Sequence, residues 1–304
     1  MALGQLERIL VLAKTYPSPS AQYIETSCVA GISQDGSMRR LYPVPFRMIE
    51  QGQQFKKWQW IDVRVEKANK DHRPESHKLY IDTITCGDII DAKKGWAFRW
   101  EWLDKIPAFH SFDSIESGRI TDGLSIALLR PKRLIGLEIV KARNHDWTDE
   151  EKEKLMREQM QGDLFSEAEA KRQVKELRKV PFDFYYRYVC DTPEGEKEHR
   201  HKSVDWEAGA LFWNCRQSYG VNWEAPFRDK LEKTLGGRDL MYLLGNQHRF
   251  QDQWLIISLV YPPKQELVEV VQISLFRRSR PECVRRASHC SRAQHWPPSN
   301  GGRS

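Results

Sequence analysis

Residues 58–68 read WQWIDVRVEKA, and every second side chain in the middle of this stretch is apolar. Ile61, Val63 and Val65 share one face of an extended chain, while the charged residues between them share the other face with two tryptophans. An alternation of this kind predicts a β-strand with one buried face. The stretch therefore favours a β-rich fold for the surrounding sequence.

Working outward from residue 58, further segments have the same strand-like character, and short turn signals separate them. Asp35-Gly36 marks a tight turn between two of them. In the last one, Ile135, Leu137 and Ile139 are predicted to point inward. These features predict a β-rich N-terminal half over residues 1–142 and favour a small barrel or a sandwich over a parallel doubly wound sheet. The segments are RILVLAKTY (8–16), TSCVAGI (26–32), RRLYPVPF (39–46), KLYIDTITCGDII (78–90) and RLIGLEIVKA (133–142).

The remaining sequence divides into three parts by composition. Residues 143–179 are rich in Glu, Lys and Arg with thin apolar stripes, which predicts a charged helical connector. Residues 180–265 combine an aromatic strand, two amphipathic helices that begin near Asp205 and Trp223, and two apolar strands that form a buried hairpin. The fold class predicted for the whole chain is therefore α+β.

The basic charge of the chain is concentrated at its C-terminal end. Seven arginines and one glutamate in residues 277–304 account for the whole formal charge of +6. These residues have no apolar periodicity, so we interpret them as a disordered, non-native tail; a basic arm that grips phosphates is the alternative. The basic pI therefore gives no support for a nucleic-acid surface on the body.

Two further features bear on location. No apolar run approaches the ~20 residues that cross a bilayer, and no export signal is recognisable. A cytoplasmic, reducing location is expected, with no membrane partner and with free cysteine thiols.

Short motifs near the N-terminus resemble a known family. LVLAK (10–14), CVAGI (28–32), Gly36 and RLYPV (40–44) together resemble the dual OB-containing domain of prokaryotic conflict systems, mainly over residues 7–140. The resemblance implies two consecutive OB-like barrels and a role in bacterial antiviral defence, in handling nucleic acid or a nucleotide. It brings no catalytic residues with it. The second half resembles uncharacterised bacterial proteins.

Arginines, lysines and aromatic rings cluster where an OB-like barrel would meet a single strand. An exposed arginine-rich hairpin and rings that fill a core are the alternative explanation of the same residues. A wider aromatic run, Trp96 to Trp102 beside Lys93 and Lys94, has the same two interpretations. The predicted nucleic-acid-binding residues are Arg39, Arg40, Arg47, Lys56, Lys57, Trp58, Trp60, Arg73, Arg99 and Trp100.

Two polar segments could hold a metal ion. Cys190, His199 and His201 offer a thiolate and two imidazoles, although a structural zinc site needs four ligands and this spacing is unusual. The loop NKDHRPESHK (69–78) offers carboxylates beside histidines, as a metal-assisted hydrolase requires. A buried strand end and a solvated loop explain the same residues without chemistry. No cofactor is indicated, and no nucleotide-hydrolase or classical hydrolase motif is present.

A possible protein partner is indicated in the connector. QGDLF, from Gln161 to Phe165, resembles the peptide by which bacterial replication proteins dock on the sliding clamp, with Leu164 and Phe165 as anchors. Attachment of the connector to its own domain is the alternative. The sequence thus predicts a nucleic-acid or nucleotide binding module in a bacterial defence system. A metal-dependent nuclease or nucleotide hydrolase and a protein–protein adaptor remain alternatives, and whether the chain is an enzyme stays open.

Overall fold

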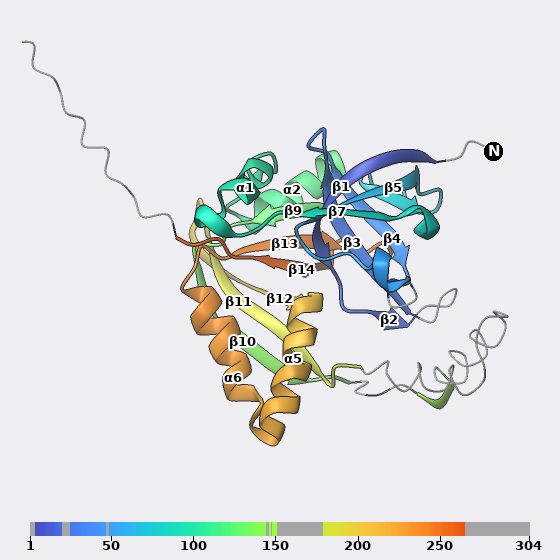
Figure 1. Cartoon of the computed structure of the whole chain (residues 1–304). Coiled ribbons are helices and arrows are strands. Elements are labelled where there is room, and N and C mark those ends of the chain that lie inside the picture. Colours follow the sequence, from blue (N-terminus) through green and yellow to red (C-terminus); the bar gives the residue numbers. More distant parts are fainter. Residues whose placement is uncertain are drawn as a thin grey trace, which may run out of the picture. The chain divides into compact units, whose positions relative to one another are not determined.

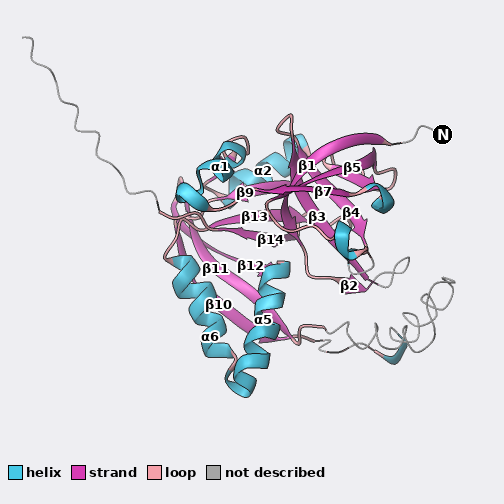
Figure 2. Ribbon diagram, viewed as in Figure 1, coloured by secondary structure: helices cyan, strands magenta, loops and turns pink. Residues whose placement is uncertain are grey.

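The computed structural model describes residues 4–19, 25–46, 49–143, 146, 148–150 and 179–264 (Figures 1 and 2). Residues 1–265 form one compact unit. No helix in these described ranges is long and apolar enough to cross a membrane. Most of the predicted connector, the peptide from Gln161 to Phe165 and the predicted tail 277–304 lie outside the described residues.

Five strands of the N-terminal half close into a barrel. β1 pairs with β3 along one edge and with β5 along the other, so the ring runs β1-β3-β4-β6-β5 and returns to β1. All pairings are antiparallel except that of β4 with β6. This connectivity is that of the OB fold, a five-stranded Greek-key barrel. The strands are β1 (Gln5–Lys14), β3 (Glu25–Ser33), β4 (Met38–Val44), β5 (Gln59–Lys67) and β6 (Ser76–Leu79).

The alternation in residues 58–68 explains how this barrel is filled. Ile61, Val63 and Val65 point into its interior with Ile9 and Val11 of β1, and all five side chains are buried. The barrel core therefore follows directly from the period-two pattern of the sequence.

Several small elements decorate the first barrel. The predicted strand 78–90 is split, because a 3-10 turn interrupts it and only its last part, β7, pairs again with β5. Helix α1 then leads to the second half. The elements are β2 (Ser18–Pro19), η2 (Gln51–Gln53), η3 (Ile81–Thr83), β7 (Thr85–Ile89) and α1 (Lys93–Leu103).

A second sheet has the order β10-β11-β12-β14-β13-β9-β8. β12 and β14 run parallel, and the predicted buried hairpin is confirmed as β13 and β14. The strands are β8 (Ala108–Phe109), β9 (Ile126–Leu129), β10 (Arg133–Lys141), β11 (Phe182–Thr192), β12 (Gly195–Ser203), β13 (Met241–Asn246) and β14 (Trp254–Val260). The helices are α2 (Phe112–Asp122), α5 (Trp206–Tyr219), η4 (Gly220–Asn222) and α6 (Glu224–Arg228), which continues as the π-helical η5 (Asp229–Thr234).

This second sheet repeats the strand order of the first barrel. β9 and β10 can be treated as one strand that is interrupted at residues 130–132. Its first part pairs with β13 and its second part pairs with β11. In the first barrel, β1 makes the equivalent two pairings with β5 and β3. α5 and α6 lie between the third and fourth strands of this ring. The second half is thus an OB-like ring with two helices packed on it (Figure 1).

The division between the halves differs from the predicted one. β9 and β10 hydrogen-bond into the second sheet, so the first barrel ends before residue 108 and not at 142. Alternation identified 133–142 as a strand, but it could not show which strand would be its neighbour. A bulge between Leu134 and Gly136 also shifts the register, and Ile135, predicted to point inward, is exposed.

The two rings share an apolar core along their outer faces. Outward side chains of β1 and β3, such as Leu12 and Ile32, pack in one cluster with Leu128, Leu243 and Ile257 of β9, β13 and β14. Trp96 and Leu103 of α1 complete this cluster. The outer wall of the first barrel is therefore an internal surface of the protein.

Candidate nucleic-acid interface

The outer face of the second and third strands is where OB folds usually bind oligonucleotides. In the first barrel these strands are β3 and β4, and the second ring covers much of their outer face. Ala30 and Ile32 lie in the shared core. Arg40 is only 3% exposed, and its Nη2 donates to the Ser125 carbonyl oxygen at 2.6 Å and to Ser125 Oγ at 3.2 Å. Arg40 therefore joins the two rings and does not face solvent.

The other predicted arginines of this region are also engaged, where they are described. Arg39 Nε donates to Glu7 Oε2 at 2.7 Å. Arg73 is buried, and its guanidinium contacts both oxygens of the Asp71 carboxylate. Arg47 lies outside the described residues. The expectation that Arg40 and Arg73 reach a polyanion is thus not met, because both guanidinium groups already have internal acceptors.

The predicted stacking platform on β5 is internal. Trp58 and Trp60 are 4% and 8% exposed, and their rings contact Trp96 and Trp102 edge-on, with centroids 5.4 Å and 4.6 Å apart. Neither ring offers a free face to a base. The sequence placed both rings on the outer face correctly, but it could not show that the rest of the chain covers this face.

Neighbouring predicted residues belong to the same packed region. Arg99 lies over the rings of Trp58 and Trp96, at 4.7 Å and 4.6 Å from their centroids. Lys57 Nζ donates to the Leu259 carbonyl oxygen at 2.6 Å, and Trp100 is half-buried. Lys56 is exposed, in contrast to the other predicted lysine and to the three predicted tryptophans, which are Lys57, Trp58, Trp60 and Trp100.

Cys190, His199 and His201 lie on one face of β11 and β12 but are not arranged as metal ligands. His201 Nδ1 is 2.8 Å from the hydroxyl of Tyr188, and burial lowers the pKa of His201 to about 4. Burial also raises the pKa of the Cys190 thiol, which favours its neutral form. Among the described residues, no group of three His, Cys, Asp or Glu side chains could hold a metal ion. The three residues instead form part of a packed aromatic cluster.

The loop 68–75 joins β5 to β6, and the loop 247–253 joins β13 to β14. Each therefore connects the fourth and fifth strands of its own ring, a connection with which OB folds contact oligonucleotides. The two loops meet: Arg73 Nη1 donates to the Asn246 carbonyl oxygen at 2.6 Å, and His248 Nε2 lies 3.9 Å from Asp71 Oδ1. Equivalent loops of the two rings thus form one surface, which we call the double-loop surface.

Internal hydrogen bonds hold the 68–75 side of this surface. Burial acts to raise the pKa of Asp71, but hydrogen bonds from Arg73 and Ser76 outweigh it and hold that pKa well below its usual value. Lys67 Nζ donates to the Arg73 carbonyl oxygen at 3.0 Å, and Glu75 Oε2 accepts from Ser125 Oγ at 2.6 Å. The backbone of the loop is therefore fixed without using its outermost side chains.

Several of those outermost side chains are basic or aromatic, and the carboxylate of Asp252 is exposed in the same loop as Arg249. Lys70, His72, His248 and Arg249 are exposed, and Phe250 is 55% exposed. Within the described ranges, neither Lys70 nor Arg249 forms an ion pair, so both charges are available. The local sequence pattern did not single out residues 247–253. An Arg-Phe pair at a loop tip between two apolar strands is the sequence signal that could have indicated this surface.

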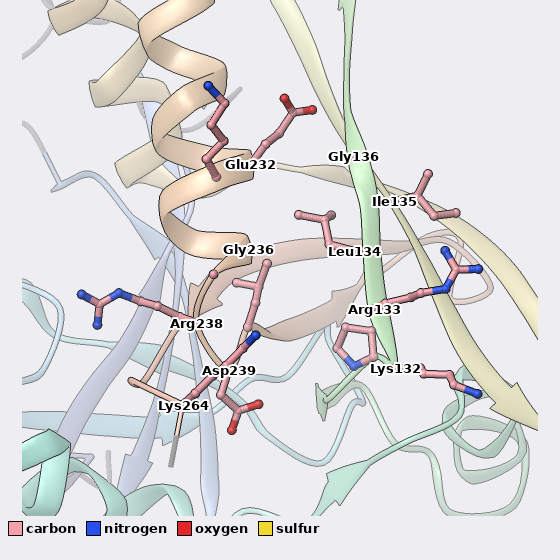
Figure 3. A pocket seen from close by; sticks show the side chains of 14 residues that line it. Lys132, Arg133, Leu134, Ile135, Gly136, Glu232, Gly236, Arg238, Asp239 and Lys264 are labelled. Carbon is pink, nitrogen blue, oxygen red and sulfur yellow. The ribbon is translucent and has the colours of Figure 1, made fainter. Parts of the chain in front are cut away.

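A cavity of about 720 Å3 lies between the start of β10 and the end of η5 (Figure 3). Leu134 points toward Gly236 across it, whereas Arg133 points to the other side of β10. Arg133 is paired with Glu196. Glu232 Oε1 accepts a hydrogen bond from Leu137 N at 2.6 Å and so covers the edge of β10. Arg238 and Lys264 in its lining are exposed and form no ion pair within the described ranges, but no aromatic ring lines the cavity. The double-loop surface combines free charges with an exposed ring and is therefore the better candidate site.

Comparisons with known proteins agree with the two-part architecture. No curated protein matches the chain. A solved structure of a replication protein A heterotrimer bound to single-stranded DNA is similar at 8% identity and a TM-score of 0.23, covering 86% of this chain and 66% of that chain, just under two thirds of its length. A TM-score this low supports no conclusion about fold or function.

Two family models divide the chain close to the boundary between the rings. The model described as domain of unknown function DUF8758 matches residues 5–105. The model described as domain of unknown function DUF8757 matches residues 108–280, which is more than half of the sequence. The chain therefore belongs to the DUF8757 family, and the part before this match is similar to the DUF8758 model.

Proposed function

We propose that this protein binds single-stranded nucleic acid on the double-loop surface. The observation that carries the proposal is the contact between loops 68–75 and 247–253, which brings equivalent connections of two OB-like rings together. Two adjacent loops can follow a strand over several nucleotides, which one loop alone cannot do.

The exposed side chains supply both kinds of contact that a single strand needs. Lys70 and Arg249 carry charges that can contact phosphates, and Phe250 offers a ring on which a base can stack. Stacking on an aromatic side chain is worth ~1–3 kcal/mol per base and is tolerant of sequence. Two phosphate contacts on a single strand give a slope of about −1.4 in log affinity against log salt.

Fluorescence anisotropy with labelled oligothymidine and oligouridine tests the proposal on the full chain. The double variant Lys70→Glu/Arg249→Glu should weaken binding and flatten its salt dependence, whereas Phe250→Ala should weaken binding at every salt concentration. The matched controls are Lys141→Glu/Lys230→Glu, with the same charge change on exposed residues elsewhere, and Tyr219→Ala, which removes an exposed ring elsewhere. Equal losses in test and control variants would assign the binding to charge in general, including the arginine-rich tail, and would refute the proposed surface.

The defence setting is a further part of the proposal, and the LVLAK, CVAGI and RLYPV motifs are its support. Cells that carry the protein should resist a phage that lyses cells without it. The variant Lys70→Glu/Arg249→Glu should abolish this resistance. If plating efficiency is the same with and without the protein across a panel of phages, the defence setting is refuted. The proposed nucleic-acid binding would not be affected by that result.

Docking on a sliding clamp through Gln161 to Phe165 also remains a prediction. Leu164→Ala/Phe165→Ala should abolish co-purification with a purified clamp, while Glu150→Ala, just outside the peptide, should not. Capture of the clamp by the double variant would refute this docking mode.

A further inference from the structure

A shallow groove of about 290 Å3 lies beside α1, away from the double-loop surface. One wall is the end of β7 and the residues after it, Ile89 to Asp91. The other wall is a face of α1 formed by Phe98, Glu101 and Trp102. Phe98 and Trp102 are four residues apart, so their rings project from the same side of the helix.

The walls of this groove are held from behind. Ile90 N donates to the Trp58 carbonyl oxygen at 2.7 Å, and Arg99 Nε donates to the Ile90 carbonyl oxygen at 3.0 Å. These two bonds fix the strand-side wall to the barrel and to α1. On the helix side, the Trp102 ring packs edge-on against Trp60. The groove therefore has a defined shape before any ligand arrives.

Two apolar side chains of the groove are available to solvent, whereas the Trp102 ring is half-buried and has Lys105 Nζ 3.7 Å from its centre. Phe98 is 45% exposed and Ile89 is 46% exposed. A volume of about 290 Å3 equals roughly ten water molecules in the liquid. That space suits a flat bicyclic ring stacked on an aromatic side chain.

Charged groups around the groove indicate which ring it would take. Asp91 is already engaged, because it accepts from Lys93 N at 2.9 Å and pairs with Lys93 Nζ at 3.4 Å. Glu101 is exposed and forms no ion pair within the described ranges. A free carboxylate beside a stacking surface requires a ligand with hydrogen-bond donors on its edge. Guanine presents two adjacent donors, N1–H and the 2-amino group, which one carboxylate can accept together.

Two lysines lie at the end of the groove where a phosphate would follow the base. Lys94 Nζ is 5.8 Å from the centre of the Phe98 ring, and Lys93 is exposed. Lys94, Gly95 and Trp96 all have left-handed backbone angles, with φ of 51°, 63° and 71°. This conformation is unfavourable for residues with side chains. Trp96 is buried, Lys93 is paired with Asp91, and Lys94 forms no ion pair within the described ranges.

We propose that this groove binds a guanine base, with Phe98 as the stacking surface, Trp102 as the wall beside it, Glu101 as the acceptor for the base edge, and Lys94 near its phosphate. The ligand is a guanosine nucleotide, either free or as one residue of a strand. The site is separate from the double-loop surface and does not depend on it.

Isothermal titration with guanosine and adenosine 5′-monophosphates tests the proposal on the full chain. We expect guanosine monophosphate to bind about 5-fold to about 150-fold more tightly, as one bidentate base contact provides. Glu101→Gln should remove this preference without weakening the adenosine nucleotide. Phe98→Ala should weaken both nucleotides. The controls are Asp104→Asn, an exposed carboxylate outside the groove, and Tyr219→Ala, an exposed ring outside both proposed sites.

Further measurements distinguish a free nucleotide from a base within a strand, and the groove from the double-loop surface. Oligothymidine with a single guanosine should bind more tightly than pure oligothymidine if the base is read within a strand, and equally if only the free nucleotide is bound. Glu101→Gln should leave binding of pure oligothymidine unchanged, and Lys70→Glu/Arg249→Glu should leave the monophosphates unchanged. Equal affinity for the two monophosphates, no saturable binding at millimolar concentration, or a preference that survives Glu101→Gln would each overturn the guanine site.

Discussion

Replacing Lys14 by methionine should raise the free energy of unfolding at pH 7. The amine of Lys14 lies at the end of β1, 3.4 Å from the centre of the Phe46 ring and 4.2 Å from that of Trp206. In the described part of the chain no carboxylate forms an ion pair with it. Burial lowers the pKa of the amine to about 8, although Glu207 and Asp205 act to raise it.

The size and sign of the effect follow from this pKa. A fall from 10.5 to about 8 corresponds to roughly 3 kcal/mol of cost for keeping the charged amine in the folded state. The two ring contacts recover ~0.5–2 kcal/mol of that cost, and partial solvent access reduces it further. The net cost is about 1–2 kcal/mol. It is fully present below pH 8, declines as pH rises from 8 to 10.5, and is absent above 10.5, where both states are neutral.

Urea denaturation followed by tryptophan fluorescence, at pH values from 6.5 to 10.5, provides the measurement. The difference in unfolding free energy between Lys14→Met and the natural sequence should favour the variant at pH 7 and shrink steadily above pH 8. Taking the difference cancels the titration of groups that both chains share. A variant less stable at pH 7, or a difference that does not change between pH 7 and 10.5, would refute the reasoning.

Two further substitutions test contacts that join the two rings, and a third tests the cap of α5. Arg40→Ala should lower the unfolding free energy by about 2–4 kcal/mol, because the Ser125 carbonyl loses one of its two donors and a cavity opens; thermal denaturation that leaves the midpoint unchanged would contradict this. Gly209→Ala should destabilise by about 1–3 kcal/mol, since the new methyl group meets the Tyr16 ring, and near-ultraviolet circular dichroism should report the displaced ring. Asp205→Ala should cost about 2–3 kcal/mol in urea denaturation, because the side chain caps α5 and accepts from a β14 amide at 2.9 Å; a loss below about 0.5 kcal/mol would count against both bonds.

Local sequence patterns predicted the interiors of the strands well. Ile61, Val63 and Val65 point into the first barrel as their spacing indicates. Asp205 caps the predicted helix, with Oδ1 accepting from Glu207 N at 2.8 Å. These features depend on the period of the chain and on residues two or three positions apart. The α+β class could therefore be predicted from the sequence.

The candidate site could not be predicted in the same way. Trp58 and Trp60 lie on the outer side of the first barrel, where the pattern places them, and Arg40 lies on the outer face of β4, but an outer face becomes internal when a second ring packs on it. The double-loop surface depends on contacts between residues more than 170 positions apart, such as Arg73 with Asn246.

The sequence by itself determined which side of each strand is apolar, where turns interrupt the strands, and where the helices of the second half begin, because each depends on neighbouring residues. Only the tertiary structure decided that β9 and β10 belong to the second sheet, that Arg40 and the β5 tryptophans are covered, and that loops 68–75 and 247–253 meet. The physical reason is that burial of an outer face is a property of long-range packing, and alternation along one strand carries no information about what lies against it.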